Sequence, residues 1–306
     1  MTKWGIVATI KAAQIDVLNF AAYHLDQGAH RLYIYLDEPA PDTYDALKAH
    51  AKIRVTACDE AYWQKQGGKR PTKHQVRQTR NATHAYHRKA EVDWLAHIDV
   101  DEFLWPTKDI ANILAGLPTN TLCARLHPIE LLADGTHAFK SYIPSGPERA
   151  ALVEHLYPTY GAYLKGGFLS HVAGKLFVRI GLANISFRIH NVFQGDLMNP
   201  GEALLSQIEL CHCHATSWNA WISAYRYRLS KGAYRADLTP AKAGGVTLHE
   251  LLVTLEAKGG DDALRGFFDE VAADSPNLRA RLEAQGLLRA CDLDLDSKRS
   301  AHFPRC

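Results

Sequence analysis

Short apolar runs alternate with segments of helical spacing over the first 126 residues, and this alternation is the strongest constraint on the fold. The apolar runs cover residues 4–10, 31–36, 53–57, 94–98 and 121–126. The segments between them that predict helices are residues 14–28, 42–51, 74–90 and 109–117. Buried strands separated by helices at this spacing predict an α/β fold, in which helices flank a mostly parallel sheet.

The positions after each predicted strand are the first place to look for a binding site. Ligands of such sheets bind beyond the carboxyl ends of the strands. These positions hold Lys11, Asp37, residues 99–102 and residues 127–134.

The pattern changes in the second half of the chain. Glycine, proline, tyrosine and histidine are frequent over residues 135–215, with strands predicted at 175–179, 185–189 and 207–214. Helical spacing then predicts helices over residues 218–231, 247–258, 261–273 and 276–285. The tail beyond residue 288 is predicted to be weakly structured.

Charge and composition exclude several classes of protein. The chain has 35 lysines and arginines against 33 acidic residues, a net charge of +2, whereas proteins that grip nucleic acid phosphates usually carry a clear basic excess. No run approaches the roughly 18 uncharged apolar residues of a membrane span, and the N-terminus is too polar for a secretory signal. Scattered cysteines favour a reduced, cytoplasmic protein.

The sharpest motif is Asp99-Val-Asp101, which directly follows the apolar run of residues 94–98. Alternate residues of an extended segment point the same way, so the two carboxylates are expected side by side at a strand end. A hard divalent cation such as magnesium or manganese would relieve their repulsion. The alternative interpretation is a solvated acidic turn.

Several segments together carry a resemblance to a known family. They are residues 5–11, 20–28, 32–37, 78–86, 94–104, 174–179, 189–190 and 212–218. In this order they resemble the family-2-like glycosyltransferases with a GT-A fold, in particular a small bacterial group with an Ile-Asp-Val-Asp-Glu-Phe signature. The chain departs from that pattern at Lys11-Ala-Ala13 and at Thr216, where the family usually has Lys-Asn-Glu and a lysine.

The resemblance implies a division of the chain and a reaction. Residues 1–234 would form the GT-A domain, with a nucleotide-sugar half over 1–105 and an acceptor half over 106–234. Residues 235–306 would be a helical extension, as a cap or as the surface of a homodimer. The implied enzyme moves a sugar from a nucleotide-sugar donor, UDP-linked by default, to a saccharide or lipid-linked acceptor. A role in polysaccharide biosynthesis, at the inner face of the membrane, is what the family suggests.

The resemblance also implies roles for individual residues. Asp99 and Asp101 would hold the divalent cation, with His190 or His212 as a further ligand. Donor-binding candidates lie at strand ends, on the helix before the motif and on the later strand: Thr9, Lys11, Asp37, Arg77, Arg80, Lys175 and Arg179.

An inverting transfer needs a carboxylate that takes the proton of the acceptor hydroxyl. Glu130 and Asp134 follow the fifth predicted strand, so either could serve. Two other classes of function stay open. One is a non-catalytic nucleotide or saccharide binder descended from a transferase. The other is a haloacid-type phosphohydrolase, although its Asp-x-Asp motif usually lies on the first strand.

Overall fold

A computed structural model describes residues 1–88, 91–135 and 137–304. The chain forms two compact units, each built from separate stretches. The first unit comprises Met1–His127, Ala173–Leu210 and the stretch from Leu293 onward, and the second comprises Pro128–Val172 and Cys211–Asp292. This differs from the expected division at residue 234. The reason is that β6 (Cys123–Leu131) and β12 (Glu202–His212) each run from one unit into the other.

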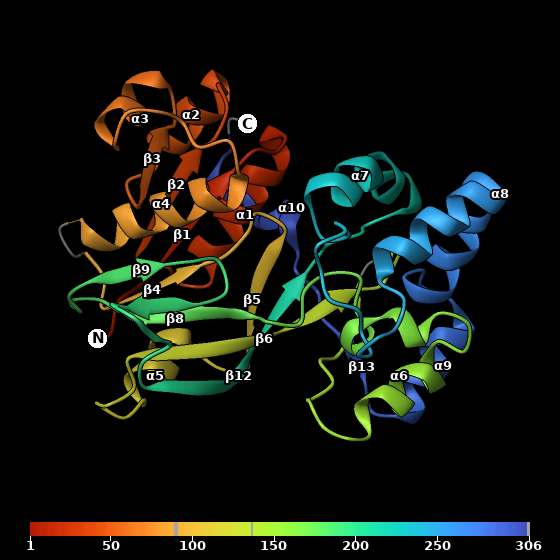
Figure 1. Cartoon of the computed structure of the whole chain (residues 1–306). Helices are drawn as coiled ribbons and strands as arrows, with labels where there is room; N and C mark the ends of the chain where they lie inside the picture. The colour runs from red at the N-terminus through yellow and green to blue at the C-terminus, as the bar shows by residue number, and fades with distance from the viewer. Residues whose placement is uncertain (89–90, 136, 305–306) are drawn as a thin grey trace. The chain divides into compact units, whose positions relative to one another are not determined.

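The sheet of the first unit is mainly parallel, as the alternation predicts (Figure 1). Its strand order is β6–β8–β4–β1–β2–β3, with β4, β1, β2 and β3 parallel to one another. β8 is antiparallel to both of its neighbours. The strands are β1 (Trp4–Ile10), β2 (Arg31–Leu36), β3 (Ile53–Ala57), β4 (Trp94–His97) and β8 (Lys175–Arg179).

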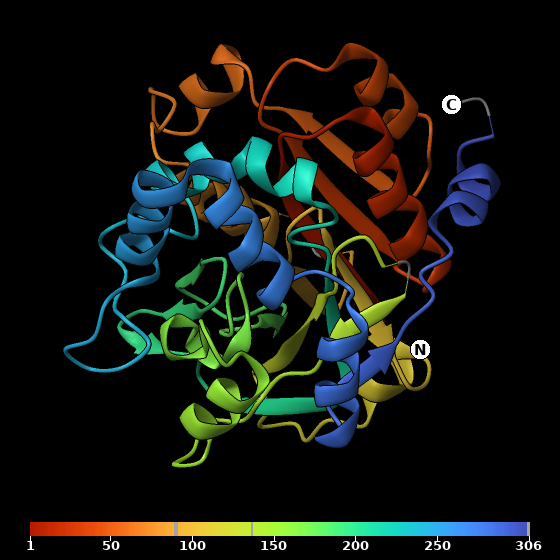
Figure 2. The same ribbon diagram turned by 90° about the vertical axis from the view of Figure 1, so that its right-hand side faces the viewer.

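Helices cover this sheet. They are α1 (Gln14–Asp26), α2 (Pro41–Lys48), α3 (Glu60–Lys65), α4 (His74–His87), α5 (Ile110–Ala115) and α10 (Leu295–His302). α10 lies against α1, where the Arg299 guanidinium donates to Asn19 Oδ1 over 2.6 Å (Figures 1 and 2). The unit also contains β5 (Glu102–Pro106), which pairs with β12, and a small antiparallel sheet of β9 (Ile185–Phe187), β10 (Val192–Gln194) and β11 (Leu197–Met198).

The second unit is mostly helical around its own core. Its elements are β7 (Ala138–Lys140), α6 (Arg149–Leu156), η1 (Gly161–Tyr163), η2 (Lys165–Gly167), α7 (Trp218–Lys231), α8 (Leu248–Val271), α9 (Pro276–Ala284) and β13 (Leu288–Ala290). Trp221 and Tyr225 of α7 pack with Phe267 and Phe268 of α8 in the core. The stripe of aromatic residues on α7 therefore faces the interior.

Most of the strands and helices predicted from the sequence are confirmed, but the C-terminal tail is not as predicted. Residues 288–290 form β13, which pairs with β7, and residues 295–302 form α10. These short elements have little periodicity of their own, because contacts with β7 and α1 stabilise them. The sequence also missed α3, β5 and α6, and the predicted helix over 74–90 ends at His87, with residues 89 and 90 outside the described ranges.

Within the described ranges, no helix is both long and apolar enough to cross a bilayer. The five cysteines in those ranges are all free thiols.

A substitution at Gly5 tests the close packing of the central parallel strands. A Cβ at Gly5 would lie 2.6 Å from the backbone oxygen of Arg31 on β2, which the paired strands cannot easily move. We expect Gly5→Ala to lower the free energy of unfolding by about 1–3 kcal/mol in urea denaturation. The matched control is Gly116→Ala, whose Cβ would meet its nearest atom at an ordinary 3.5 Å. Equal stabilities of the two variants would contradict this packing.

Candidate functional site

The buried face of α4 connects the carboxyl ends of three parallel strands. Arg77 of α4 contacts Asp37, which follows β2, and Gln78 contacts Asp99, which follows β4. Asn81 donates to the Thr9 hydroxyl near the end of β1 over 3.0 Å. Since the side chains at 77, 78 and 81 share one helix face, a single helix brings the three strand ends into one cluster.

The Asp-x-Asp motif lies in a turn and not on an extended segment. β4 ends at His97, and the Glu102 N–H donates to the Asp99 carbonyl oxygen over 3.2 Å. The Glu102 carboxylate in turn accepts the Asp99 N–H over 2.7 Å. The expectation that alternation along a strand places the two aspartates side by side is therefore wrong, because these bonds fold the chain back into β5.

A buried lysine compensates the charge of Asp99. Lys175 Nζ lies 2.6 Å from Asp99 Oδ2 and 3.2 Å from Glu102 Oε2, and Gln78 donates to Asp99 Oδ1 over 2.6 Å. Burial alone would lower the pKa of Lys175, but the two carboxylates outweigh it and raise that pKa. The pKa of Asp99 is lowered because Lys175 outweighs the effect of burial, so both groups are charged.

The backbone conformation of Gly174 places the neighbouring Lys175 beside Asp99. Its φ of 68° lies in the left-handed region, and a Cβ there would meet the Leu126 carbonyl oxygen at 1.9 Å. The Gly174 carbonyl accepts a hydrogen bond from His190 Nδ1 over 2.9 Å, which orients the imidazole ring. His190 also contributes to the low pKa of Asp99 and so belongs to this cluster.

Asp37 is engaged in ion pairs of its own. Its buried carboxylate contacts the Arg77 guanidinium at 2.7 Å, Arg70 at 3.1 Å and His74 at 3.5 Å. Burial alone would raise the pKa of Asp37, but the hydrogen bonds from His74 and Arg77 and the charges of Arg77 and Arg70 lower it to about 2.

The other donor-binding candidates fall in different places. The exposed Lys11 pairs with Glu38 at 2.6 Å, beside the end of β1. Arg80 is exposed, on a different face of α4 from Gln78 and Asn81. Arg179 pairs in register with Trp94 at the start of β4, and its guanidinium lies over the Trp94 ring. The structure therefore gathers Thr9, Asp37, Arg77 and Lys175 but leaves Arg179 at the opposite end of β4 from Asp99.

Asp101 has a carboxylate neighbour that the sequence did not reveal. Asp16 of α1 has a raised pKa, mainly because of partial burial and also because of the negative charge of Asp101. Two neighbouring carboxylates suit a hard cation. Gln78 and Lys175 contact the two carboxylate oxygens of Asp99, and the roles of Asp99 and Asp101 as metal ligands stay predictions.

In the second unit, Glu130 and Asp134 differ sharply in environment. Glu130 is buried, with Lys140 Nζ at 2.7 Å and the N–H groups of Leu169 and Ser170 donating to it. The pKa of Glu130 is lowered, because the charge and hydrogen bond of Lys140 outweigh burial. Asp134 is exposed in a turn with φ 62° and is the more accessible of the two carboxylates.

His212 lies at the end of β12 among other imidazoles. Its ring centroid is 5.0 Å from that of His171 and 5.3 Å from that of His214. Imidazole nitrogens are ligands for several divalent metals. The ligation of a metal by His212 stays a prediction.

Sequence reasoning missed Gln78 and Asn81 as members of the cluster, and the effect of Asp101 on the pKa of Asp16. Gln78 and Asn81 could have been found from helical spacing, because polar residues on the otherwise buried face of a helix need partners. Nothing in the sequence pairs Asp16 with Asp101, which lies 85 positions further along the chain.

Comparison with protein families gives a match within the first unit of the chain. Residues 7–117 match the model of glycosyltransferase family 92, a stretch that runs from β1 to the end of α5. The match supports a glycosyltransferase and so a transferase enzyme. The narrower resemblance to the family-2-like group stays a prediction. No curated protein matches the chain.

Similar solved structures include HddC from Yersinia pseudotuberculosis, with 11% identity and a TM-score of 0.37 over 74% of this chain and 99% of that one. The glycosyltransferase GlyE of Streptococcus pneumoniae TIGR4 has 16% identity and a TM-score of 0.27 over 41% of this chain and 30% of that one. Its apo form has 14% identity and a TM-score of 0.24 over 41% and 29%.

The ion pairs of Asp37 predict a pH dependence of stability. The pKa of Asp37 is lowered from 3.8 to about 2 on folding, so its contribution is complete above about pH 4 and is lost as the pH falls through 2. We expect Asp37→Asn to cost about 2 kcal/mol in urea unfolding at pH 7. The difference from the wild type should narrow as the pH falls from about 4 towards 2. A difference that is independent of pH would contradict the ion pairs. Asp45→Asn, on the exposed face of α2, is the control and should change little.

Proposed function

We propose that the chain is a metal-dependent glycosyltransferase that uses a nucleotide-sugar donor, UDP-linked, and a saccharide or lipid-linked acceptor. The observation that carries the proposal is the cluster of polar side chains at the carboxyl ends of β1, β2 and β4. This cluster lies largely within the segment that matches glycosyltransferase family 92. Such an edge is where α/β sheets bind nucleotides. With a lipid-linked acceptor, the enzyme would work at the inner face of a membrane.

Different residues at this edge of the sheet would bind different parts of the donor. Thr9 and Lys11, at the end of β1, would face the nucleoside. Asp37 would act by holding Arg70 and Arg77 in place, since its carboxylate already contacts both. Arg70, which is exposed, would be available to the donor.

Asp101, together with Asp99, would hold a magnesium or manganese ion, and Asp16, whose pKa the charge of Asp101 helps to raise, would add to the negative charge there. When bound, such an ion supplies positive charge to the departing nucleoside diphosphate. Lys175, Gln78 and Glu102 would position the turn that carries Asp99 and Asp101, because they fix both carboxylate oxygens and the N–H of Asp99. A turn held in this way needs no rearrangement when the donor binds.

Asp134 is the better candidate for a general base in an inverting transfer. Its carboxylate is exposed, whereas that of Glu130 is buried against Lys140. Asp134 would take the proton of the acceptor hydroxyl as that oxygen attacks the anomeric carbon of the donor sugar. Glu130 would instead stabilise the fold around its own ion pair with Lys140.

Calorimetry with UDP tests the donor site. We expect UDP to bind in the presence of manganese and binding to weaken at least about tenfold in Asp101→Asn, because the cation loses a charged ligand. GDP and CMP serve as competing nucleotides, and a chelator should abolish the manganese-dependent part. The matched control is Asp196→Asn, an exposed aspartate between β10 and β11.

The result that would overturn the proposal is the absence of binding for all three nucleotides, with and without manganese. Binding of UDP without any turnover of UDP-sugars would instead favour a non-catalytic relative of the transferases.

Asp134→Asn and Glu130→Gln separate catalysis from stability. Asparagine tolerates a positive φ, so Asp134→Asn should fold normally. We expect it to lower the transfer rate about 100-fold or more while UDP binding is unchanged. Glu130→Gln leaves the Lys140 charge buried without its counter-charge and should lower the free energy of unfolding by about 3 kcal/mol or more. Full transfer activity in Asp134→Asn would rule it out as the base.

A further inference from the structure

One segment of this nearly neutral chain is strongly cationic. Residues 61–90 contain eight lysines and arginines and no aspartate or glutamate. The rest of the chain then carries 27 basic against 33 acidic residues, so the excess positive charge is concentrated in this segment. A local field of this kind attracts anions even when the net charge of a protein is small.

Only part of this charge is neutralised within the fold. Asp37 compensates Arg70 and Arg77. Within the described residues, Lys65, Lys69, Lys73 and Arg80 make no ion pair, and all four are exposed. The positive charge that remains therefore faces solvent along the loop before α4 and on the helix itself.

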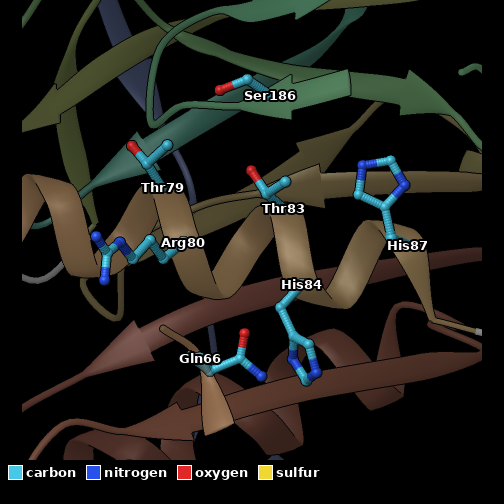
Figure 3. Close-up of a pocket in the computed structure, with 7 residues that line it drawn as sticks. All are labelled: Gln66, Thr79, Arg80, Thr83, His84, His87 and Ser186. Carbon is cyan, nitrogen blue, oxygen red and sulfur yellow. The ribbon is translucent and has the colours of Figure 1, made fainter. Parts of the chain in front are cut away.

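A groove runs along α4 in this segment, with a volume of about 460 Å³. It is lined by Gln66, Thr79, Arg80, Thr83, His84, His87 and Ser186. Figure 3 shows Thr79 and Thr83 pointing towards Ser186 of β9, and His84 pointing towards Gln66 at the end of α3. The lining contains a guanidinium, two imidazoles, three hydroxyls and an amide, but no carboxylate.

Several of these groups have hydrogen-bond donors available for a ligand. The Thr83 hydroxyl accepts the Phe187 N–H over 2.9 Å, which leaves its own proton to donate. Within the described residues, Arg80, Gln66 and the Ser186 hydroxyl make no side-chain hydrogen bond. A groove with an arginine, spare donors and no carboxylate suits an oxyanion with several acceptor oxygens.

The groove is separate from the cluster around Asp99. Successive residues of a helix are 100° apart, so positions 79, 80, 83, 84 and 87 form the side of α4 opposite to Gln78, Asn81 and Ala82. The latter three are buried against the sheet side, where Gln78 and Asn81 contact Asp99 and Thr9. The same helix therefore presents one polar face to the strand ends and another to solvent.

We propose that this groove is a second binding site that takes the phosphate group of a ligand. The Arg80 guanidinium would pair with the phosphate in a bidentate fashion, while the Ser186 and Thr83 hydroxyls would donate to its remaining oxygens. Lys65, Lys69 and Lys73 would attract the anion at long range. The site does not depend on the transferase proposal, because none of its residues contacts Asp99 or Asp37.

Calorimetry at fixed ionic strength tests the site with sodium phosphate, and with acetate as a carboxylate of lower charge. We expect saturable phosphate binding that Arg80→Gln weakens about tenfold and Ser186→Ala weakens less. The matched control is Lys52→Gln, which removes an exposed charge before β3, outside the segment. Asp101→Asn is a second control that should leave phosphate binding unchanged. Circular dichroism checks that each variant is folded.

A second experiment identifies the source of the phosphate. It measures binding of the protein to phosphatidylcholine vesicles that contain or lack phosphatidylglycerol. Binding of free phosphate that depends on Arg80 supports a soluble ligand. Binding only to phosphatidylglycerol vesicles, again dependent on Arg80, supports the same site with a lipid headgroup as its ligand. Equal effects of Arg80→Gln and Lys52→Gln, loss of phosphate binding in Asp101→Asn, or no binding to either probe would overturn the proposal.

Discussion

Three polar side chains of α4 hold the carboxyl ends of three parallel strands. Arg77, Gln78 and Asn81 are buried, and a buried polar group without a partner costs about 1–3 kcal/mol. Asp37, Asp99 and Thr9 supply those partners. The position of α4 on the sheet is therefore set by hydrogen bonds as well as by apolar packing, and Thr9, Asp37 and Asp99 are held by this helix.

Each unit also contains a buried lysine beside a carboxylate. In the first unit Lys175 lies between Asp99 and Glu102, and in the second Lys140 pairs with Glu130. Such pairs contribute little net stability compared with apolar packing, but removing one partner is costly. Their effect is to hold a loop in one conformation. Lys175 does so for the Asp-x-Asp turn, and the Lys140–Glu130 pair does so for the chain at Leu169 and Ser170.

The two polar faces of α4 separate two kinds of electrostatic environment. On the sheet side Arg77 and Gln78 meet carboxylates and Asn81 meets the Thr9 hydroxyl, so the charges there are compensated. On the solvent side Arg80 and the lysines of the preceding loop have no such partners in the described residues, and the groove retains an affinity for anions. Residues 61–90 thus contribute Arg77, Gln78 and Asn81 to the cluster at the strand ends, and Arg80 to the anion-binding groove. Helical periodicity alone assigns each residue to its face.

The sequence by itself determined the α/β class, because alternating apolar runs and helical segments are local patterns that each element carries in its own residues. It also located Asp37, Asp99 and Asp101 at strand ends. Only the tertiary structure decided the contacts and the pKa shifts of Asp37 and Asp99, because their partners come from a helix and from β8. The same holds for the pairing of Glu130 with Lys140, the neighbourhood of Asp16 and Asp101, the docking of α10 on α1 and the interleaved units. These depend on contacts between residues far apart in the chain, which no local pattern records.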